Sequence, residues 1–183
     1  MDKVITFVKK IIKTRVVKKD NENINISCDM TCGRGNDTLF LAEVSNKVYA
    51  FDIQKEAIES TKALTKDFDN VILINDSHEN ILKYINEEVD IFMYNLGYLP
   101  KGDHLITTNY KSTINSLKDA LKILKRNGLI TIIIYPGHSE GYTESIEITN
   151  YLKTLNQKEY EVLKYEFINQ INMPPYAYII QKL

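Results

Sequence analysis

The sequence is poor in cysteine, with Cys28 and Cys32 as its only two. Their C-x-x-x-C spacing comes without a second ligand pair, so it supports neither a zinc site nor a disulfide framework. No apolar run approaches the roughly 20 residues of a membrane-spanning helix. The amino terminus also lacks the uninterrupted apolar core of a signal peptide. We therefore expect a cytoplasmic protein without a metal site and without a membrane partner.

The sequence also lacks an excess of charge of either sign, because its formal net charge is −1 over 183 residues. Such a balance argues against a protein that wraps DNA or long duplex RNA. Internal repeats, low-complexity segments and linkers are absent as well. The length suits one domain with a sizeable core. We predict a single domain over residues 1–183, with a basic helix in residues 1–20 packed on it.

Short apolar runs alternate with longer amphipathic ones, which predicts a parallel sheet covered by helices on both faces. Strands are expected at 24–28, 47–52, 71–75, 90–94, 129–135, 160–168 and 176–181. Helices are expected at 3–18, 37–45, 54–67, 78–87, 109–126 and 141–154. The last two strands have a short connection, so they should pair as an antiparallel hairpin. The predicted fold class is α/β: a Rossmann-like, seven-stranded, mostly parallel sheet with a C-terminal antiparallel hairpin, an arrangement that resembles the class I methyltransferase fold.

A glycine turn follows the first predicted strand. Gly33 and Gly35 tolerate positive φ and allow a ligand to approach the backbone closely. Residues 36–38 carry capping-type side chains for the next helix, whose start would present free N–H groups to a polar ligand. Asp52 ends the following apolar run, nineteen positions after Gly33, where a carboxylate can accept hydrogen bonds from ribose hydroxyls. The pattern predicts a nucleoside-containing cofactor.

An acid at the end of the first strand favours S-adenosylmethionine (SAM) over a dinucleotide. Asp29 would repel a pyrophosphate and attract the ammonium group of SAM. Thr38 stands where a dinucleotide fingerprint has a third glycine or alanine. A nicotinamide-dependent oxidoreductase is therefore the weaker alternative. A third possibility is an ordinary βα turn with a solvated Asp52 and no cofactor.

Polar loops follow the third, fourth and fifth predicted strands, at the edge where open α/β sheets bind ligands. All three histidines, His78, His104 and His138, fall in these loops. Asp76 is a candidate partner for the adenine amino group, or it caps the following helix together with Ser77. His104 and His138 could accept a released proton, or could be hydrogen-bonded loop residues.

The segment Asn95-Leu96-Gly97-Tyr98 is the candidate centre of the chemistry. Methyl transfer needs the nucleophile in line with the methyl group and close to it. An amine must also arrive neutral, because an ammonium has no lone pair. The Asn95 carbonyl and a nearby backbone carbonyl could accept the hydrogens of such an amine and direct its lone pair. Tyr98 could stack on a base or cover the methyl group; alternatively, Asn95 caps a turn and Tyr98 packs.

Two further features are compatible with RNA. Aromatic rings can stack on unpaired bases, although scattered tyrosines are also common packing residues. Five tyrosines lie in or beside the predicted loops: Tyr98, Tyr110, Tyr135, Tyr142 and Tyr176. The first helix is unevenly basic and includes Lys9 and Lys10. These lysines form either a phosphate-contacting patch or a solvated helix face.

Five motifs together carry a family resemblance. They are D-x-T-C-G-x-G-N-D-T at 29–38, Y-x-F-D-I-Q at 49–54, N-L-G-Y-L-P-x-G-D at 95–103, G-H-x-E-G at 137–141 and F-x-N-Q at 167–170. The set resembles the bacterial methyltransferases labelled putative rRNA methylases. The resemblance implies SAM-dependent conversion of 5-aminomethyl-2-thiouridine, at wobble position 34 of tRNA, into the 5-methylaminomethyl form. The implied partner is the tRNA anticodon stem-loop, bound by a monomer or homodimer.

The residue patterns and the resemblance together predict three sets of site residues. The cofactor set is Asp29, Thr31, Gly33, Gly35, Asn36, Asp37, Asp52, Gln54, Asp76, His78 and Asn95. The substrate set is Lys9, Lys10, Leu96, Gly97, Tyr98, His104, Tyr135, Gly137, His138 and Tyr176. The catalytic set is Asn95, Tyr98 and His138. Methylation of rRNA, of a small molecule or of a protein, and a non-catalytic binding module, are the alternatives.

Overall fold

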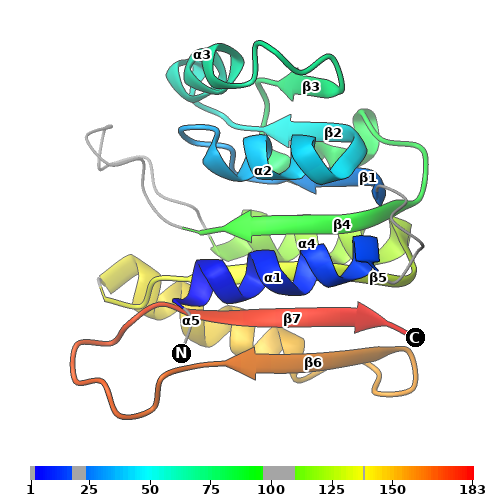
Figure 1. Ribbon diagram of the computed structural model, residues 1–183. Coiled ribbons are helices and arrows are strands. Elements are labelled where there is room, and N and C mark those ends of the chain that lie inside the picture. Colours follow the sequence, from blue (N-terminus) through cyan, green and yellow to red (C-terminus); the bar gives the residue numbers. More distant parts are fainter. Residues whose placement is uncertain (1–2, 18–23, 97–109, 138) are drawn as a thin grey trace.

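The computed structural model describes residues 3–17, 24–96, 110–137 and 139–183 (Figure 1). Within these residues one sheet has the strand order β3-β2-β1-β4-β5-β7-β6. The strands are β1 (Ile24–Asp29), β2 (Ser45–Phe51), β3 (Val71–Ile74), β4 (Val89–Asn95), β5 (Leu124–Ile134), β6 (Tyr160–Tyr165) and β7 (Tyr176–Lys182). The helices are α1 (Val4–Val17), α2 (Asn36–Val44), α3 (Lys55–Leu64), the 3-10 helix η1 (His78–Lys83), α4 (Tyr110–Ile123) and α5 (Ser139–Leu152).

The sheet is parallel from β3 to β5 and antiparallel at its other end. β1 pairs in parallel with both β2 and β4, whereas β7 runs antiparallel to β5 and β6. The predicted sheet with its C-terminal antiparallel hairpin is therefore confirmed. The chain order reverses at β1, because β2 lies on one side of it and β4 on the other. Ligands of open α/β sheets bind outside the carboxyl ends of the strands at such a reversal.

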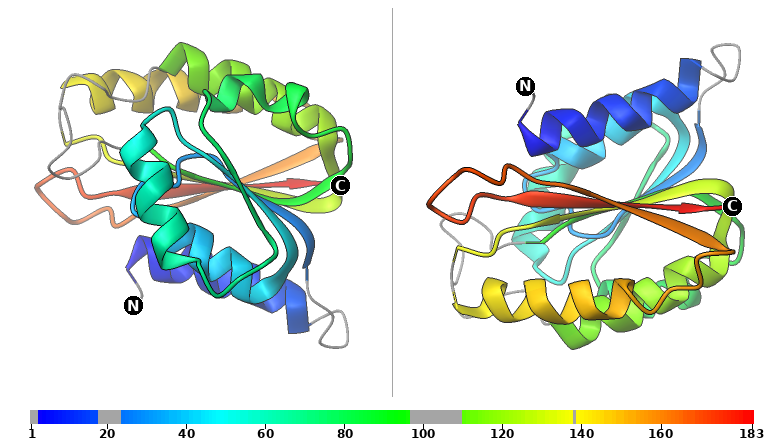
Figure 2. Two further views of the ribbon diagram at one scale, coloured as in Figure 1. Left: turned by 90° about the horizontal axis from the view of Figure 1, so that it is seen from above. Right: turned by 90° about the horizontal axis from the view of Figure 1, so that it is seen from below.

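Helices cover both faces of the sheet, with α1 and α2 on one face and α4 and α5 on the other (Figure 2). The alternation of β4 side chains shows why. Met93 packs with α1 and α2, whereas the neighbouring Phe92 and Tyr94 pack with α4 and α5. A central parallel strand buries both of its faces, so its sequence is apolar throughout. In the part of the chain that the structure describes, no helix is long and apolar enough to cross a membrane.

Helix α1 lies across the antiparallel half of the sheet, against β5 and β7. Val8 and Ile12 are its most deeply buried side chains. Phe7 stacks on Tyr165 of β6 with 3.8 Å between the ring centroids. The helix runs along the strands, between the C-terminal hairpin and α2 (Figure 1).

Several predicted boundaries are wrong, and one has a clear physical reason. The helix predicted at 109–126 ends at Ile123, and β5 begins at Leu124, five residues earlier than expected. Asn127 has a φ of 63°, and a Cβ at Gly128 would lie 2.7 Å from the Lys125 carbonyl oxygen. The strand thus contains an irregular segment that only an Asn-Gly pair fits easily. The helix predicted at 78–87 is the short 3-10 helix η1, β6 ends at Tyr165 rather than at 168, and α3 ends at Leu64 rather than at 67.

Candidate functional site

The candidate site lies where the carboxyl ends of β1, β2 and β4 meet. The Thr31 hydroxyl joins the first and last of these strands. It donates to the Asn95 carbonyl oxygen at 3.1 Å and accepts from the Asn95 N–H at 3.0 Å. The end of β4 is therefore held directly beside the glycine turn.

The glycine turn has the backbone conformation that the sequence predicts. Gly33 and Gly35 both have positive φ, at 51° and 85°. A Cβ at Gly35 would lie 2.9 Å from Cα of Thr61 in α3, so a larger residue would push these helices apart. The expectation that side chains of residues 36–38 cap α2 is wrong. Gly35 occupies the N-cap position and no side chain caps the helix, which leaves its first turn suited to a polar ligand.

Asp52 follows β2 and faces the glycine turn. Its two carboxylate oxygens accept from the N–H groups of Gly33 and Gln54, both at 2.9 Å. Partial burial raises the pKa of this carboxyl, while backbone N–H groups act to lower it. A carboxylate offers about four acceptor positions, so Asp52 retains capacity for the hydroxyls of a ribose. The geometry fits the predicted contact.

Asp29 is completely buried beneath the turn. Its carboxylate accepts from the Thr38 hydroxyl at 2.6 Å and from the Thr31 N–H at 3.2 Å. Burial, and then the negative charge of Asp37, raise the pKa of Asp29 well above its usual range. Asp29 would therefore act on a cationic ligand through its field rather than by direct contact.

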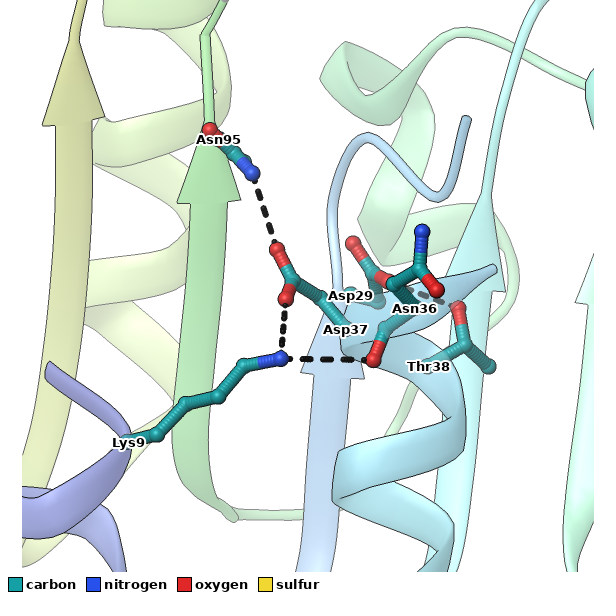
Figure 3. Close-up of polar contacts among 6 residues, drawn as sticks. All are labelled: Lys9, Asp29, Asn36, Asp37, Thr38 and Asn95. Atoms are coloured by element: carbon teal, nitrogen blue, oxygen red, sulfur yellow. Dashed lines mark hydrogen bonds and ion pairs between the residues drawn. The ribbon is translucent and has the colours of Figure 1, made fainter. Parts of the chain in front are cut away.

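Asp37, in the first turn of α2, connects two other elements to the site (Figure 3). Its Oδ1 lies 2.7 Å from Nζ of Lys9 in α1, and its Oδ2 accepts from Nδ2 of Asn95 at 2.9 Å. Lys9 Nζ also donates to the Asn36 carbonyl at 3.3 Å and lies over the Phe40 ring. The ammonium group of Lys9 thus faces Asp37 and the start of α2, and a contact of Lys9 with substrate phosphate stays a prediction. The sequence signal for the Lys9 contact is Asp37, an acid in the first turn of α2. A buried carboxylate of this kind needs a positively charged partner.

Tyr135 lies beside Asn95, one residue after β5. Burial and the charge of Asp37 raise the pKa of Tyr135, whereas a side-chain hydrogen bond with Asn95 lowers it. The Tyr135 side chain is partly exposed, so it borders the site. Leu96 is buried, and its N–H donates to the Ile133 carbonyl at 2.9 Å. Leu96 thus fixes the backbone after Asn95 and turns its side chain into the core.

The loop after β3 is held by its own side chains. Asp76 accepts from the Ser77 N–H, from Asn80 Nδ2 and from the Tyr84 hydroxyl. Ser77 caps η1 by accepting from the Glu79 N–H. The capping role is therefore confirmed for Ser77, whereas Asp76 holds the loop through the three bonds above, and its contact with adenine stays a prediction.

His78 is buried against Tyr94, with 5.9 Å between the ring centroids. Burial lowers the pKa of its imidazole to about 4, so the ring is neutral at pH 7. Its Nδ1 has no hydrogen-bond partner among the described residues. This buried nitrogen has the capacity to bond a polar ligand, which is compatible with the predicted cofactor role.

A groove of about 580 Å³ lies between α5 and the segment that joins β6 to β7. Pro136 and Tyr176 line it on the side of the sheet edge, and Tyr142 lines it from α5. Tyr176 is largely buried, and the Lys164 ammonium lies 4.2 Å from its ring centroid. That face of the ring is therefore covered by a cation, whereas Tyr142 is half exposed and open to stacking.

The other predicted substrate residues divide into two groups. Lys10 is exposed on α1, and Gly137 is exposed after β5. Gly97, Tyr98, His104 and His138 lie outside the described residues, so the structure does not place these parts of the predicted substrate and catalytic sets. The structure does bring together the predicted cofactor residues from β1, the glycine turn, β2 and the end of β4.

Comparison with known proteins gives this geometry a context. Residues 48–181 match the family described as "Putative rRNA methylase". A curated protein of Arabidopsis thaliana, named tRNA (mnm(5)s(2)U34)-methyltransferase, chloroplastic, is 32% identical over 193 residues. The match covers 97% of this chain and 69% of that protein.

Two solved structures match this chain over its full length. A putative rRNA methylase from Clostridium thermocellum is 38% identical, with a TM-score of 0.93 and coverage of 100% of this chain and 99% of the other. A putative methyltransferase from Streptococcus mutans, solved in complex with SAH, is 32% identical, with a TM-score of 0.89 and the same coverage. These matches confirm the methyltransferase fold that the sequence predicts.

Proposed function

The chain belongs to the family of putative rRNA methylases, and on that premise we propose that it is a SAM-dependent tRNA N-methyltransferase. It methylates the 5-aminomethyl group of uridine or 2-thiouridine at wobble position 34, which gives the 5-methylaminomethyl nucleoside. The name of the Arabidopsis relative supports this substrate. The SAH bound to the Streptococcus mutans protein supports SAM as the methyl donor.

The charges of the candidate site support a cationic cofactor. Asp29, Asp37 and Asp52 lie around the glycine turn, and the ammonium group of Lys9 pairs with Asp37. Burial raises the pKa of Asp29 to about 7, so Asp52 and a partly ionised Asp29 remain to favour the sulfonium and the ammonium of SAM. Its carboxylate would face the uncapped start of α2. Its ribose diol would bond to Asp52, flanked by Gln54 and Asn36.

The orientation of Asn95 is the observation that carries the proposal. Its Nδ2 donates to Asp37, and its Oδ1 has two acceptor positions, so it can accept a hydrogen from an incoming amine even beside the Tyr135 hydroxyl. When bound, SAM supplies an electrophilic methyl group on a positively charged sulfur. The neutral amine forms the new N–C bond with its lone pair while the C–S bond breaks, and one proton then leaves the nitrogen. Asn95 orients that lone pair, and no strong base is needed.

The partner that we propose is the anticodon stem-loop of tRNA. Bases in such a loop are unpaired and can stack on aromatic side chains. Tyr135 and Tyr142 are exposed at the same edge of the sheet as Asn95. Tyr98 would stack or cover the methyl group, and His138 would receive the released proton. The reaction is expected in the cytoplasm, by a monomer or a homodimer.

The decisive experiment uses purified protein, SAM with a labelled methyl group, and tRNA from cells that lack the native enzyme. The tRNA is digested to nucleosides, and the labelled product is identified by mass. Label in 5-methylaminomethyl-2-thiouridine or its 2-oxo analogue supports the proposal. Label in another nucleoside, or in rRNA supplied in parallel, would keep the methyltransferase and discard this substrate. Binding of SAM without labelling of any RNA would favour a small-molecule or protein substrate.

A further inference from the structure

Lys9 connects helix α1 to the candidate site across 28 positions of sequence. Its Nζ lies 2.7 Å from one oxygen of Asp37, while the other oxygen accepts from Asn95 Nδ2 at 2.9 Å. One carboxylate therefore lies between an ammonium and a carboxamide, as Figure 3 shows. Asp37 is buried and the Lys9 side chain is 26% exposed, so water screens this contact only weakly.

The carboxamide of Asn95 can present either of its ends to a ligand. An ionised carboxylate only accepts hydrogen bonds, so Asp37 in this form faces the NH₂ group of Asn95. Without a fixed carboxylate partner the amide could flip. The flipped amide would present hydrogens to the incoming amine and could not accept from it. The bond to Asp37 thus decides which atom of Asn95 is available.

Lys9 is the cation that pairs with the buried Asp37 carboxylate. Loss of one partner of a buried ion pair leaves the other charge uncompensated. Among the described residues, Asp29 and Tyr135 also face Asp37, whose charge raises the pKa of both. The start of α2 favours a negative charge by a modest amount. Lys9 supplies the full positive charge at hydrogen-bond distance.

We infer that Lys9 is a positioning residue for methyl transfer, since its ion pair with Asp37 keeps the Asn95 carbonyl oxygen directed at the acceptor amine. The inference rests on the N-methylation proposed above. It gives α1 a part in the chemistry that is separate from any contact with RNA. The prediction that Lys9 binds substrate phosphate is the alternative that the test must distinguish.

The test compares three variants of the full chain. Lys9→Met removes the charge and keeps the length, Lys9→Arg keeps the charge, and Lys13→Met is the matched control. Lys13 also lies over the Phe40 ring, at 5.6 Å from its centroid. For Lys9→Met we expect kcat on tRNA to fall about 10- to 100-fold, as for loss of a charged hydrogen bond, with the KM for tRNA and the Kd for SAM nearly unchanged. Lys9→Arg should restore most of kcat, and Lys13→Met should leave kcat as it is.

Two kinetic outcomes would overturn the inference. A higher KM for tRNA with unchanged kcat would make Lys9 an RNA contact. A weaker Kd for SAM with unchanged kcat at saturation would make it part of the cofactor site. If Lys9→Met does not fold, Asp37→Asn tests the same point, because this isosteric change removes the charge that fixes the amide. Asp37→Asn should lower kcat as much, and the double variant should lose no more than either single one.

A second readout does not depend on turnover. The side-chain NH₂ signals of Asn95 in a ¹⁵N spectrum, assigned by their loss in Asn95→Ala, report its bond to Asp37. They should move in Lys9→Met and stay in place in Lys13→Met and Lys9→Arg. If the wild type methylates no tRNA but these signals respond as expected, the proposed function fails and the coupling of Lys9 to Asn95 holds. Unmoved signals in Lys9→Met would refute the coupling itself.

Discussion

The two ends of the sheet differ in how their polar and apolar side chains are arranged. Around β1 and β2, polar side chains are paired within the protein: Asp29 with Thr38, Asp37 with Lys9, and Asp52 with backbone N–H groups. Around β6 and β7, apolar side chains remain exposed, and Ile168 and Ile171 are 92% and 93% accessible. Large exposed apolar patches mark interaction surfaces. The polar side chains of the first region are thus already paired, whereas the exposed apolar side chains of the second are where we propose contact with a larger partner.

The largest expected effect tests whether the organised region performs the chemistry. Asn95→Ala removes the carbonyl that directs the amine, so we expect kcat to fall about 100- to 1,000-fold, as for loss of a preorganised polar group. The Kd for SAM, measured by calorimetry, should change much less. Equal losses in SAM affinity and turnover would make Asn95 a cofactor residue and blur the distinction between the two regions.

How far the sequence predicts this organised region can be judged residue by residue. Gly33, Gly35 and Asp52 are local in the chain and follow predictable strands, so their positions around one turn follow from pattern alone. The Lys9–Asp37 contact depends on how α1 docks, and a basic helix composition suggests RNA instead. The early start of β5 was missed because Lys125 and Arg126 look like a helix end. Asn127-Gly128 is nevertheless a turn signal that could have indicated the irregular strand.

The pH dependence of the free energy of unfolding tests whether His78, in the same half of the molecule, is shielded from water. His78 stays neutral in the folded state down to about pH 4, whereas an unfolded histidine takes up a proton below about pH 6.5. Its contribution to stability is therefore complete above pH 6.5 and is lost as the pH falls from 6.5 to 4. The loss amounts to about 3 kcal/mol.

The measurement is denaturant unfolding of the wild type and of His78→Phe, which keeps a ring against Tyr94. The difference in free energy of unfolding between the two should change by that amount between pH 6.5 and 4. Comparison with the variant cancels the opposite trend from Asp29, whose raised pKa favours the folded state at lower pH. Parallel curves would mean that His78 is solvated.

Asp52→Ala should weaken SAM binding about 10- to 100-fold, because a ribose loses a charged acceptor. Calorimetric titration with SAM measures the effect. Ile53→Ala, at the exposed neighbouring position, is the matched control and should bind SAM like the wild type. Unchanged affinity in Asp52→Ala would remove the ribose assignment.

The smallest expected effect tests the exposed apolar side chains around β6 and β7. Replacing Ile168 and Ile171 together by serine should raise the KM for tRNA about 3- to 10-fold, as apolar contact with a partner is lost. The Kd for SAM and the melting temperature should remain the same, because both side chains are almost fully exposed. Ile72→Ser, on the exposed face of β3, is the control at the opposite end of the sheet. An unchanged KM would mean that tRNA does not use this surface.

The packing of α1 on β7 has a consequence for the order in which the protein is made. The docking surface of the first helix is complete only when the last strand has joined the sheet, because α1 packs on β7 as well as on β5, and Phe7 needs Tyr165 of β6 in the same way. At a synthesis rate of about 5–20 residues per second, α1 is therefore made well before β6 and β7, which begin more than 150 positions after Lys9 in the chain. A ribosome that stops before residue 176 releases a chain whose α1 has no β7 to rest on. The complete packing of α1 should therefore form late, and a chain without β7 should lack a firmly held Lys9–Asp37 ion pair.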